Sequence, residues 1–115
     1  MYTYAVTVTK VVDGDTIDVS IDVGFGISIS HRIRLYGLNT AEVHSSVLEE
    51  RTKAQSAKKY VQDFVALGNI TMESFKSDKY GRYLGKLYSG SRCLNDELLS
   101  QNLAAPYFGE GVKSY

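Results

Sequence analysis

The sequence predicts a mainly β domain of the α+β class, with five strands and two helices. Short segments rich in β-branched and aromatic residues recur between turn signals, which is typical of strands. One longer segment, 50–67, has apolar residues at helical spacing. A shorter, leucine-containing segment with helical character follows the last strand. The expected order is therefore three strands, a helix, two strands and a second helix.

The first two strands are expected to form a hairpin. Residues 2–12, YTYAVTVTKVV, have strand composition, and Asp13-Gly14 is a hairpin turn signal. Residues 16–23 alternate apolar and polar types, which predicts a half-buried strand. Its inward side chains are expected to be Ile17, Val19, Ile21 and Val23. The same register places Asp15 on the apolar side, at the start of the strand.

The third strand is predicted over residues 27–36, after a Gly24-Phe25-Gly26 turn. Its inward side chains are expected to be Ile27, Ile29, Ile33 and Leu35. Arg34 then lies on the opposite face, together with Ser28, Ser30 and Arg32. Residues 43–49 have no periodicity and are expected to form a loop.

The helix predicted over residues 50–67 ends at Gly68, because glycine commonly follows the last helical residue. Its apolar side comprises Ala54, Ala57, Val61, Phe64 and Val65. Two further strands, 69–75 and 82–88, are joined by the turn-forming segment KSDKYG.

The second helix is expected to begin near Asn95, a favourable residue type for an N-cap. Its apolar side comprises Leu94, Leu98 and Leu99. Asn102 is the expected C-terminal stop. The tail from residue 104, AAPYFGEGVKSY, has no periodicity.

This order of elements is that of the OB-fold, a small five-stranded Greek-key barrel that commonly binds oligonucleotides. Other α+β meanders share the order, so the order alone does not decide the fold. A chain of 115 residues without repeats or internal linkers is expected to form one domain, residues 1–115.

The composition excludes several classes of protein. The formal net charge is zero, so a general basic field cannot hold nucleic acid, and phosphate recognition requires a few placed cations. Cys93 is the single cysteine, which excludes an internal disulfide. No apolar run is long enough for a membrane span. Because Met1 leads almost directly into a strand without a signal peptide, we expect a cytoplasmic protein; removal of a leader is the alternative.

Two charged residues of the predicted strands indicate a site. Asp15 is expected on the apolar side of its strand, where a carboxylate needs a cation, a hydrogen-bond donor or a metal. The alternative is a simple turn in which Asp13 or Asp15 bonds nearby backbone amides. Arg34 offers a guanidinium fork that can grip a phosphate, with a solvated strand arginine as the alternative.

Further polar residues follow the end of the third strand. Asn39, Thr40 and Glu42 supply an amide, a hydroxyl and a carboxylate, or form an ordinary turn and loop. The segment DKYGR, residues 78–82, places two cations beside a tight turn, with a solvated hairpin as the alternative.

Together, these residues form a coherent set. Asp15, Asn39 and the Thr40 carbonyl are oxygen donors at adjacent strand ends, and oxygen-only ligation suits Ca²⁺ or Mg²⁺. Two arginines, Arg34 and Arg82, and the carboxylate of Glu42 around such a metal would make a phosphodiester hydrolysis site. In such a site a phosphate oxygen binds the metal, the acid positions or deprotonates water, and the guanidiniums stabilise the developing charge.

In these motifs the chain resembles the staphylococcal (thermo)nuclease family, in unbroken order over residues 4–105. The matching motifs are VVDGDT, RIRLYGLNTAE, the long helix, DKYGR and LNDELLSQNLA. The resemblance implies an OB-fold and calcium-dependent hydrolysis of DNA and RNA. Mg²⁺ is the alternative ion, and we expect it to support activity less than Ca²⁺. The implied partners are DNA and RNA as substrates, and we expect a monomer without a membrane partner.

The resemblance also implies roles for individual residues. The implied metal ligands are Asp15, Asn39 and Thr40, the last through its carbonyl. The implied catalytic residues are Arg34 and Arg82, which grip phosphate, and Glu42, which orients or deprotonates water. The implied neighbours of the metal or the nucleotide are Asp13, Lys79 and Tyr80.

The sequence departs from the family pattern in three places. Residue 39 is an acid in the staphylococcal enzyme and asparagine here, and Ala41 replaces the usual proline, so the loop carrying Glu42 is expected to be less rigid. The third, C-terminal helix of the type member is expected to be absent. The alternative function is a catalytically weak or inactive OB-fold module that binds nucleic acid or protein. We expect catalysis, because a pure binder does not need to keep Arg34, Glu42 and Arg82 together.

Overall fold

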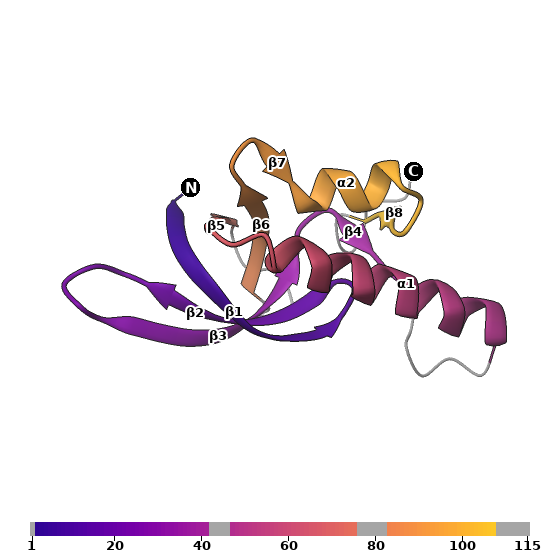
Figure 1. The fold of residues 1–115 in the computed structure, drawn as a ribbon, viewed down its shortest axis with the longest axis horizontal. Helices are drawn as coiled ribbons and strands as arrows, with labels where there is room; N and C mark the ends of the chain where they lie inside the picture. The colour runs from indigo at the N-terminus through magenta and orange to yellow at the C-terminus, as the bar shows by residue number, and fades with distance from the viewer. Residues whose placement is uncertain (1, 42–46, 76–82, 108–115) are drawn as a thin grey trace.

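Five strands form a closed barrel, which confirms the predicted OB-fold (Figure 1). The computed structural model describes residues 2–41, 47–75 and 83–107. The barrel strands are β1 (Thr3–Asp13), β2 (Thr16–Asp22), β3 (Ser28–Leu35), β5 (Ile70–Phe75) and β6 (Tyr83–Ser89). Antiparallel pairing gives the order β3-β2-β1-β5-β6, and a parallel pairing of β3 with β6 closes the barrel.

Three shorter strands complete the sheet structure of the described residues: β4 (Leu38–Asn39), β7 (Arg92–Cys93) and β8 (Ala105–Pro106). Strand β7 extends the edge at β6, and β4 pairs antiparallel with β8. The backbone N–H of Tyr107 donates to the carbonyl of Gly37 at 2.9 Å. The segment after the second helix therefore holds the segment that follows β3. Strands of two residues leave no periodicity, so the sequence did not predict them.

Helix α1 (Leu48–Val65) begins and ends two residues earlier than predicted. Its buried side chains are Ala54, Ala57, Val61 and Phe64, as the apolar spacing indicated. Gly68 has a φ of +81°, a left-handed conformation that glycine adopts without strain, and it ends the helix as expected.

Helix α2 (Leu94–Ser100) ends in a Schellman motif. Asn102 has a φ of +58°, and its N–H donates to the carbonyl of Leu99. The N–H of Leu103 donates to the carbonyl of Leu98. The prediction that Asn102 ends this helix is confirmed.

Asn95 is a buried residue within α2, so the prediction that it forms the N-cap is wrong. Cys93 holds the N-cap position without a side-chain cap, and Asn95 is 1% exposed. Its Oδ1 accepts a hydrogen bond from the Leu87 N–H at 3.1 Å, and its Nδ2 donates to the carbonyls of Tyr36 and Gly85 at 2.9 and 3.2 Å. The side chain thus joins α2 to both strands of the seam at which the barrel closes.

The β2–β3 hairpin extends beyond the barrel, away from both helices (Figure 1). The predicted inward positions of Val23, Ile27 and Ile29 are wrong, because these side chains are 38%, 54% and 43% exposed. The other predicted inward side chains are buried: Ile17, Val19, Ile21, Ile33 and Leu35. Alternation identifies the two faces of a strand, but it does not show where a ribbon leaves the core.

The hydrophobic core fills the barrel and the space beneath the two helices. Its most buried large side chains are Ile17, Ile33, Leu35, Leu38, Val61, Phe64, Leu87, Leu94 and Leu98. Two helices are present within the described residues, as predicted. Neither is long and apolar enough to cross a membrane, when only the described parts of the chain are considered.

Candidate active site

Three chain segments meet at one pocket: the β1–β2 turn, the end of β3 and the stretch that begins with β4. The pocket has a volume of about 180 Å³. It is lined by Asp13, Asp15, Thr16, Arg34, Asn39, Thr40 and Ala41. The register explains the meeting, because Thr16 pairs with Arg34 across β2 and β3 and so brings the turn beside the end of β3.

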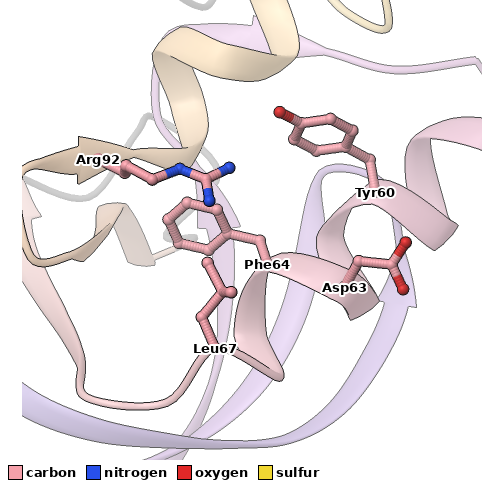
Figure 2. Close-up of a pocket in the computed structure, with 5 residues that line it drawn as sticks. All are labelled: Tyr60, Asp63, Phe64, Leu67 and Arg92. Carbon is pink, nitrogen blue, oxygen red and sulfur yellow. The ribbon is translucent and has the colours of Figure 1, made fainter.

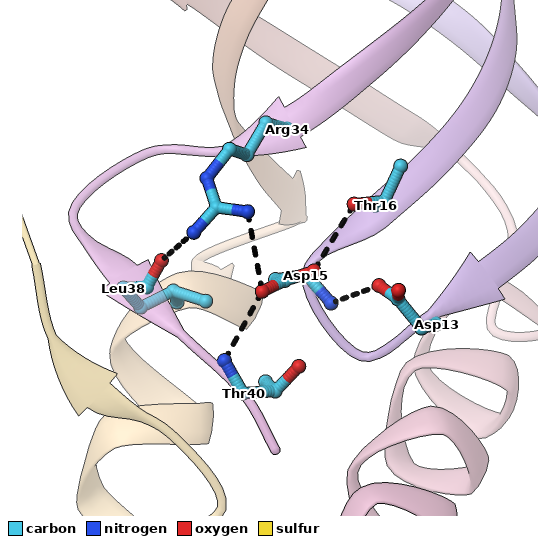
Figure 3. A network of polar contacts seen from close by, with 6 residues as sticks. All are labelled: Asp13, Asp15, Thr16, Arg34, Leu38 and Thr40. Atoms are coloured by element: carbon cyan, nitrogen blue, oxygen red, sulfur yellow. Dashed lines mark hydrogen bonds and ion pairs between the residues drawn. The ribbon is translucent and has the colours of Figure 1, made fainter. Parts of the chain in front are cut away.

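Asp15 is the centre of the polar contacts in this pocket (Figure 3). It is 7% exposed, which confirms its predicted inward position. Its Oδ2 accepts hydrogen bonds from the backbone N–H of Thr40 at 3.1 Å and from Nη1 of Arg34 at 3.3 Å. Its Oδ1 accepts a hydrogen bond from the Thr16 hydroxyl at 3.0 Å. Hydrogen bonds and one cation therefore satisfy this buried carboxylate.

The turn that carries Asp15 is shaped by its neighbours. The N–H of Asp15 donates to Oδ1 of Asp13 at 3.1 Å, so the side chain of Asp13 closes the turn. A Cβ atom at Gly14 would lie 2.7 Å from the Cβ of Ala57 and 3.0 Å from Cγ2 of Thr40. Glycine here and alanine on α1 thus let the helix pack directly against the floor of the site.

Asp13 and Asp15 ionise at different pH values although they are neighbours. Burial, together with the adjacent Asp15, raises the pKa of Asp13 from 3.8 to about 6. Burial also opposes ionisation of Asp15, but hydrogen bonds from Asp13 and Thr40 and the charge of Arg34 hold its pKa below the ordinary value. A proton bound by this pair therefore resides on Asp13.

Arg34 is held in place on several sides. Its Nη1 contacts Asp15, and its Nη2 donates to the Leu38 carbonyl at 3.3 Å (Figure 3). Its Cζ lies 5.6 Å from the ring centroid of Tyr107, within cation–π range. The described acceptors use two of the five N–H donors that a guanidinium carries, so the others can reach a phosphate. Tyr107 was not among the predicted site residues, because it lies in a tail without periodicity.

The pocket offers oxygen donors of the kind that a hard divalent cation binds. The described residues hold no group of three or more His, Cys, Asp or Glu side chains suited to a metal. The pocket instead combines the carboxylates of Asp13 and Asp15 with the Asn39 side chain, and amide oxygens are ordinary calcium ligands. No His or Cys is among its described lining residues, so the set fits Ca²⁺ better than Zn²⁺. The contact made by Thr40 is through its N–H, and ligation by its carbonyl stays a prediction.

A larger pocket of about 510 Å³ adjoins this one. It shares Asn39, Thr40 and Ala41 with the first pocket and extends over Lys53 and residues 102–106. Asn39 is exposed and lies where the two pockets meet. The site therefore has an open side that a large substrate can enter.

A separate pocket of about 200 Å³ lies between α1 and β7 (Figure 2). It is lined by Tyr60, Asp63, Phe64, Leu67 and Arg92. The Cζ of Arg92 lies 5.4 Å from the ring centroid of Phe64, and its guanidinium donates two hydrogen bonds to Glu97 at 2.8 and 2.6 Å. The Tyr60 hydroxyl donates to the same carboxylate at 2.6 Å. These polar groups fasten α1 to α2.

The described part of the chain brings together five predicted site residues: Asp13, Asp15, Arg34, Asn39 and Thr40. Four others lie outside the described residues: Glu42, Lys79, Tyr80 and Arg82. The roles of all nine stay predictions.

Comparison with known families agrees with this arrangement. The model of the staphylococcal nuclease homologue family matches residues 32–114, which include Arg34, Asn39 and Thr40. The chain belongs to this family. A search of the curated proteins gave no match.

As a staphylococcal nuclease homologue, the protein is a member of a family of nucleases and nucleic-acid-binding proteins. The family match begins within β3. Asp13 and Asp15 precede the match, and the β1–β2 hairpin brings them to the matched residues. The candidate site is thus formed by residues on both sides of the start of the match.

Proposed function

We propose that this protein is a calcium-dependent, sugar-nonspecific endonuclease that hydrolyses phosphodiester bonds of DNA and RNA and prefers single strands. The observation that carries the proposal is the placement of Arg34. Asp15 and the Leu38 carbonyl fix its guanidinium at the wall of a pocket that two carboxylates and an amide line. A phosphate-binding cation beside oxygen donors for a divalent ion is the combination that phosphodiester hydrolysis uses. Family membership supports this function.

The described residues have distinct proposed roles. Asp15, Asn39 and the Thr40 carbonyl hold Ca²⁺, with Asp13 beside them. When bound, the ion supplies Lewis-acid stabilisation of a phosphate oxygen. Arg34 binds the phosphate through its remaining N–H donors and stabilises the negative charge that develops on it in the transition state.

Residues outside the described parts of the chain complete the proposed set. Glu42 orients or deprotonates the attacking water, and Arg82 supplies a second guanidinium fork. Lys79 and Tyr80 contact the nucleic acid. Single strands are expected to be cut faster than duplexes, because an OB groove follows one backbone and stacks bases on aromatic side chains.

Digestion assays test the proposal. Labelled single-stranded DNA, duplex DNA and RNA are incubated with the protein in calcium, in magnesium and in a chelator. We expect cleavage in millimolar calcium, weaker cleavage in magnesium, none in chelator, and the fastest rate on single strands. Single-stranded DNA that stays intact with micromolar protein in calcium would instead favour the alternative, an OB-fold module that binds nucleic acid or protein without cutting it.

Asn39→Asp is expected to tighten calcium binding about 10- to 100-fold, an order of magnitude taken from the dependence of calcium affinity on ligand charge. Asn39 is a neutral member of the donor set, so Asp15 is the one charged direct ligand among the proposed three. The rate at saturating calcium should change much less, because a less neutralised metal is a stronger Lewis acid. Calorimetric titration with calcium, in parallel with activity, measures both effects.

Asn69→Asp is the matched control for this variant. Asn69 is exposed and lies between α1 and β5, so the same charge is added outside the pocket. Its calcium affinity should equal that of the wild type. If Asn39→Asp also leaves the affinity unchanged, residue 39 does not touch the metal, and Asp13 becomes the first alternative ligand.

A further inference from the structure

We propose that Tyr36, Phe75 and Lys86 form a nucleotide subsite beside the candidate active site, here named the aromatic platform. The platform stacks a base of single-stranded nucleic acid and binds a phosphate of the same strand. This inference rests on the proposed nuclease function, and it identifies where the substrate strand lies beyond the bond that is cut.

The two rings of the platform form a flat stack. The ring centroids of Tyr36 and Phe75 lie 4.1 Å apart, and the ring planes differ by 5°. Both residues are half-buried, so the protein supports the stack while part of it remains accessible. Rigid aromatic surfaces of this kind stack nucleobases whatever their sequence, because every base has a π face. This matches a substrate that is bound without base readout.

Lys86 adds a cation that forms no ion pair with a carboxylate among the described residues. Its Nζ lies 5.9 Å from the ring centroid of Phe75. The register places Glu73 directly opposite Lys86, yet the Glu73 carboxylate accepts a hydrogen bond from the Tyr88 hydroxyl at 3.3 Å. None of the ion pairs found among the described residues includes Lys86. In a protein of zero net charge, such a cation beside an aromatic stack suits a phosphate.

The platform is continuous with the candidate active site. The strand register pairs Arg34 with Leu84 and Leu84 with Phe75, so these residues form one row across β3, β6 and β5. Gly85 and Leu87 are buried, and side chains alternate along a strand, so Leu84 and Lys86 lie on the outer side of the barrel. Phe75 is two strand spacings from Arg34, about 10 Å. A strand held by Arg34 at one phosphate therefore reaches the platform with a neighbouring nucleotide.

The β2–β3 hairpin shows why exposure alone does not make such a site. Phe25 at its tip is fully exposed, but it has no stacked partner ring among the described residues. The nearest charged residue in sequence is Asp22, which would repel a phosphate. The hairpin tip and the platform thus provide a matched pair of aromatic positions for a test.

Binding is measured by fluorescence anisotropy in chelator, with labelled decathymidylate and with a ten-unit abasic strand that has the same backbone but no bases. Phe75→Leu is expected to weaken decathymidylate binding about tenfold, the loss typical of one stacked base, and to leave binding of the abasic strand unchanged. Lys86→Met is expected to weaken the binding of both the decathymidylate and the abasic strand. The slope of log affinity against log salt concentration should become shallower by about 0.7, as for one lost phosphate contact. In calcium, the same variants should raise KM and leave kcat unchanged.

Phe25→Leu and Lys59→Met are the matched controls, because Phe25 is fully exposed on the hairpin and the side chain of Lys59 is 75% exposed on α1. Their affinities should equal that of the wild type. Thermal unfolding of each variant ensures that only folded proteins are compared. Wild-type binding without cleavage in calcium would overturn the nuclease proposal and leave the platform standing. If the wild type cleaves DNA but Phe75→Leu and Lys86→Met have the same affinity and KM as the wild type, the platform proposal is overturned and the nuclease proposal stands.

Discussion

Arg34→Ala is expected to lower kcat/KM for cleavage of single-stranded DNA by about 10²-fold or more, the loss seen when a preorganised donor is removed from a developing charge. The side chain is 13% exposed and is fixed by Asp15 and the Leu38 carbonyl, so it does not have to be ordered when substrate binds. The loss should appear mainly in kcat, because the charge on phosphate increases in the transition state. Single-turnover cleavage in saturating calcium measures it.

Two further variants separate chemistry from folding. Removing Arg34 leaves the buried Asp15 carboxylate without its cation, which also destabilises the fold. Arg34→Lys keeps the positive charge but cannot form the fork, so it should retain more stability and still lose activity. Arg32→Ala is the matched control, because Arg32 is an exposed residue of the same strand and pairs with Asp18 at 2.8 Å. Near-normal turnover in Arg34→Ala would remove Arg34 from the mechanism.

Asn95→Ala is expected to lower the free energy of unfolding by about 3 kcal/mol. The substitution leaves the Leu87 N–H and the carbonyls of Tyr36 and Gly85 without their side-chain partner. Each buried backbone group left in this way costs about 1 kcal/mol. Urea unfolding followed by far-ultraviolet circular dichroism measures the change, as a lower midpoint at an unchanged slope.

Ser100→Ala is the control for Asn95→Ala. The Ser100 hydroxyl donates to the Glu97 carbonyl on the exposed side of the same helix, so its loss should change stability by less than about 0.5 kcal/mol. Asn95→Asp tests the donors specifically, because a carboxylate still accepts from Leu87 but cannot donate to two carbonyls. A loss below about 1 kcal/mol in Asn95→Ala would mean that other contacts hold the seam.

The positions of the strands along the chain and most of their buried side chains could be predicted, because alternation is a local property. Ile17, Val19 and Ile33 are buried where the pattern placed them. The closure of the barrel was expected only from the order of the elements and the family resemblance, because the parallel pairing of β3 with β6 joins segments that are distant in sequence. Asn95 illustrates the difference: the same side chain suits a helix N-cap or a buried cross-link, and its surroundings alone decide which.

The candidate site was predictable only in part, for a related reason. The alternation of β2 placed Asp15 on the inward side of its strand. The alternation of β3 placed Arg34 on the outward side of its strand. The contact of Asp15 with the Thr40 N–H depends on a turn whose path no periodicity encodes. Tyr107 reaches Arg34 because β8 pairs with β4. Each of these strands has only two residues, which is too short to show a periodic pattern in the sequence.

The pairing of β4 with β8 also sets the time at which the site is assembled in a newly made chain. Asn39 pairs with Ala105, so the proposed metal-ligand segment acquires its partner strand only near the end of the described sequence. Because translation proceeds from the N-terminus, Asp15 and Arg34 leave the ribosome long before that partner is made. The paired strands β1, β2 and β3, which carry Asp15 and Arg34, can therefore form while the position of Asn39 is still unset, and the pocket is complete only after Ala105 has joined the fold.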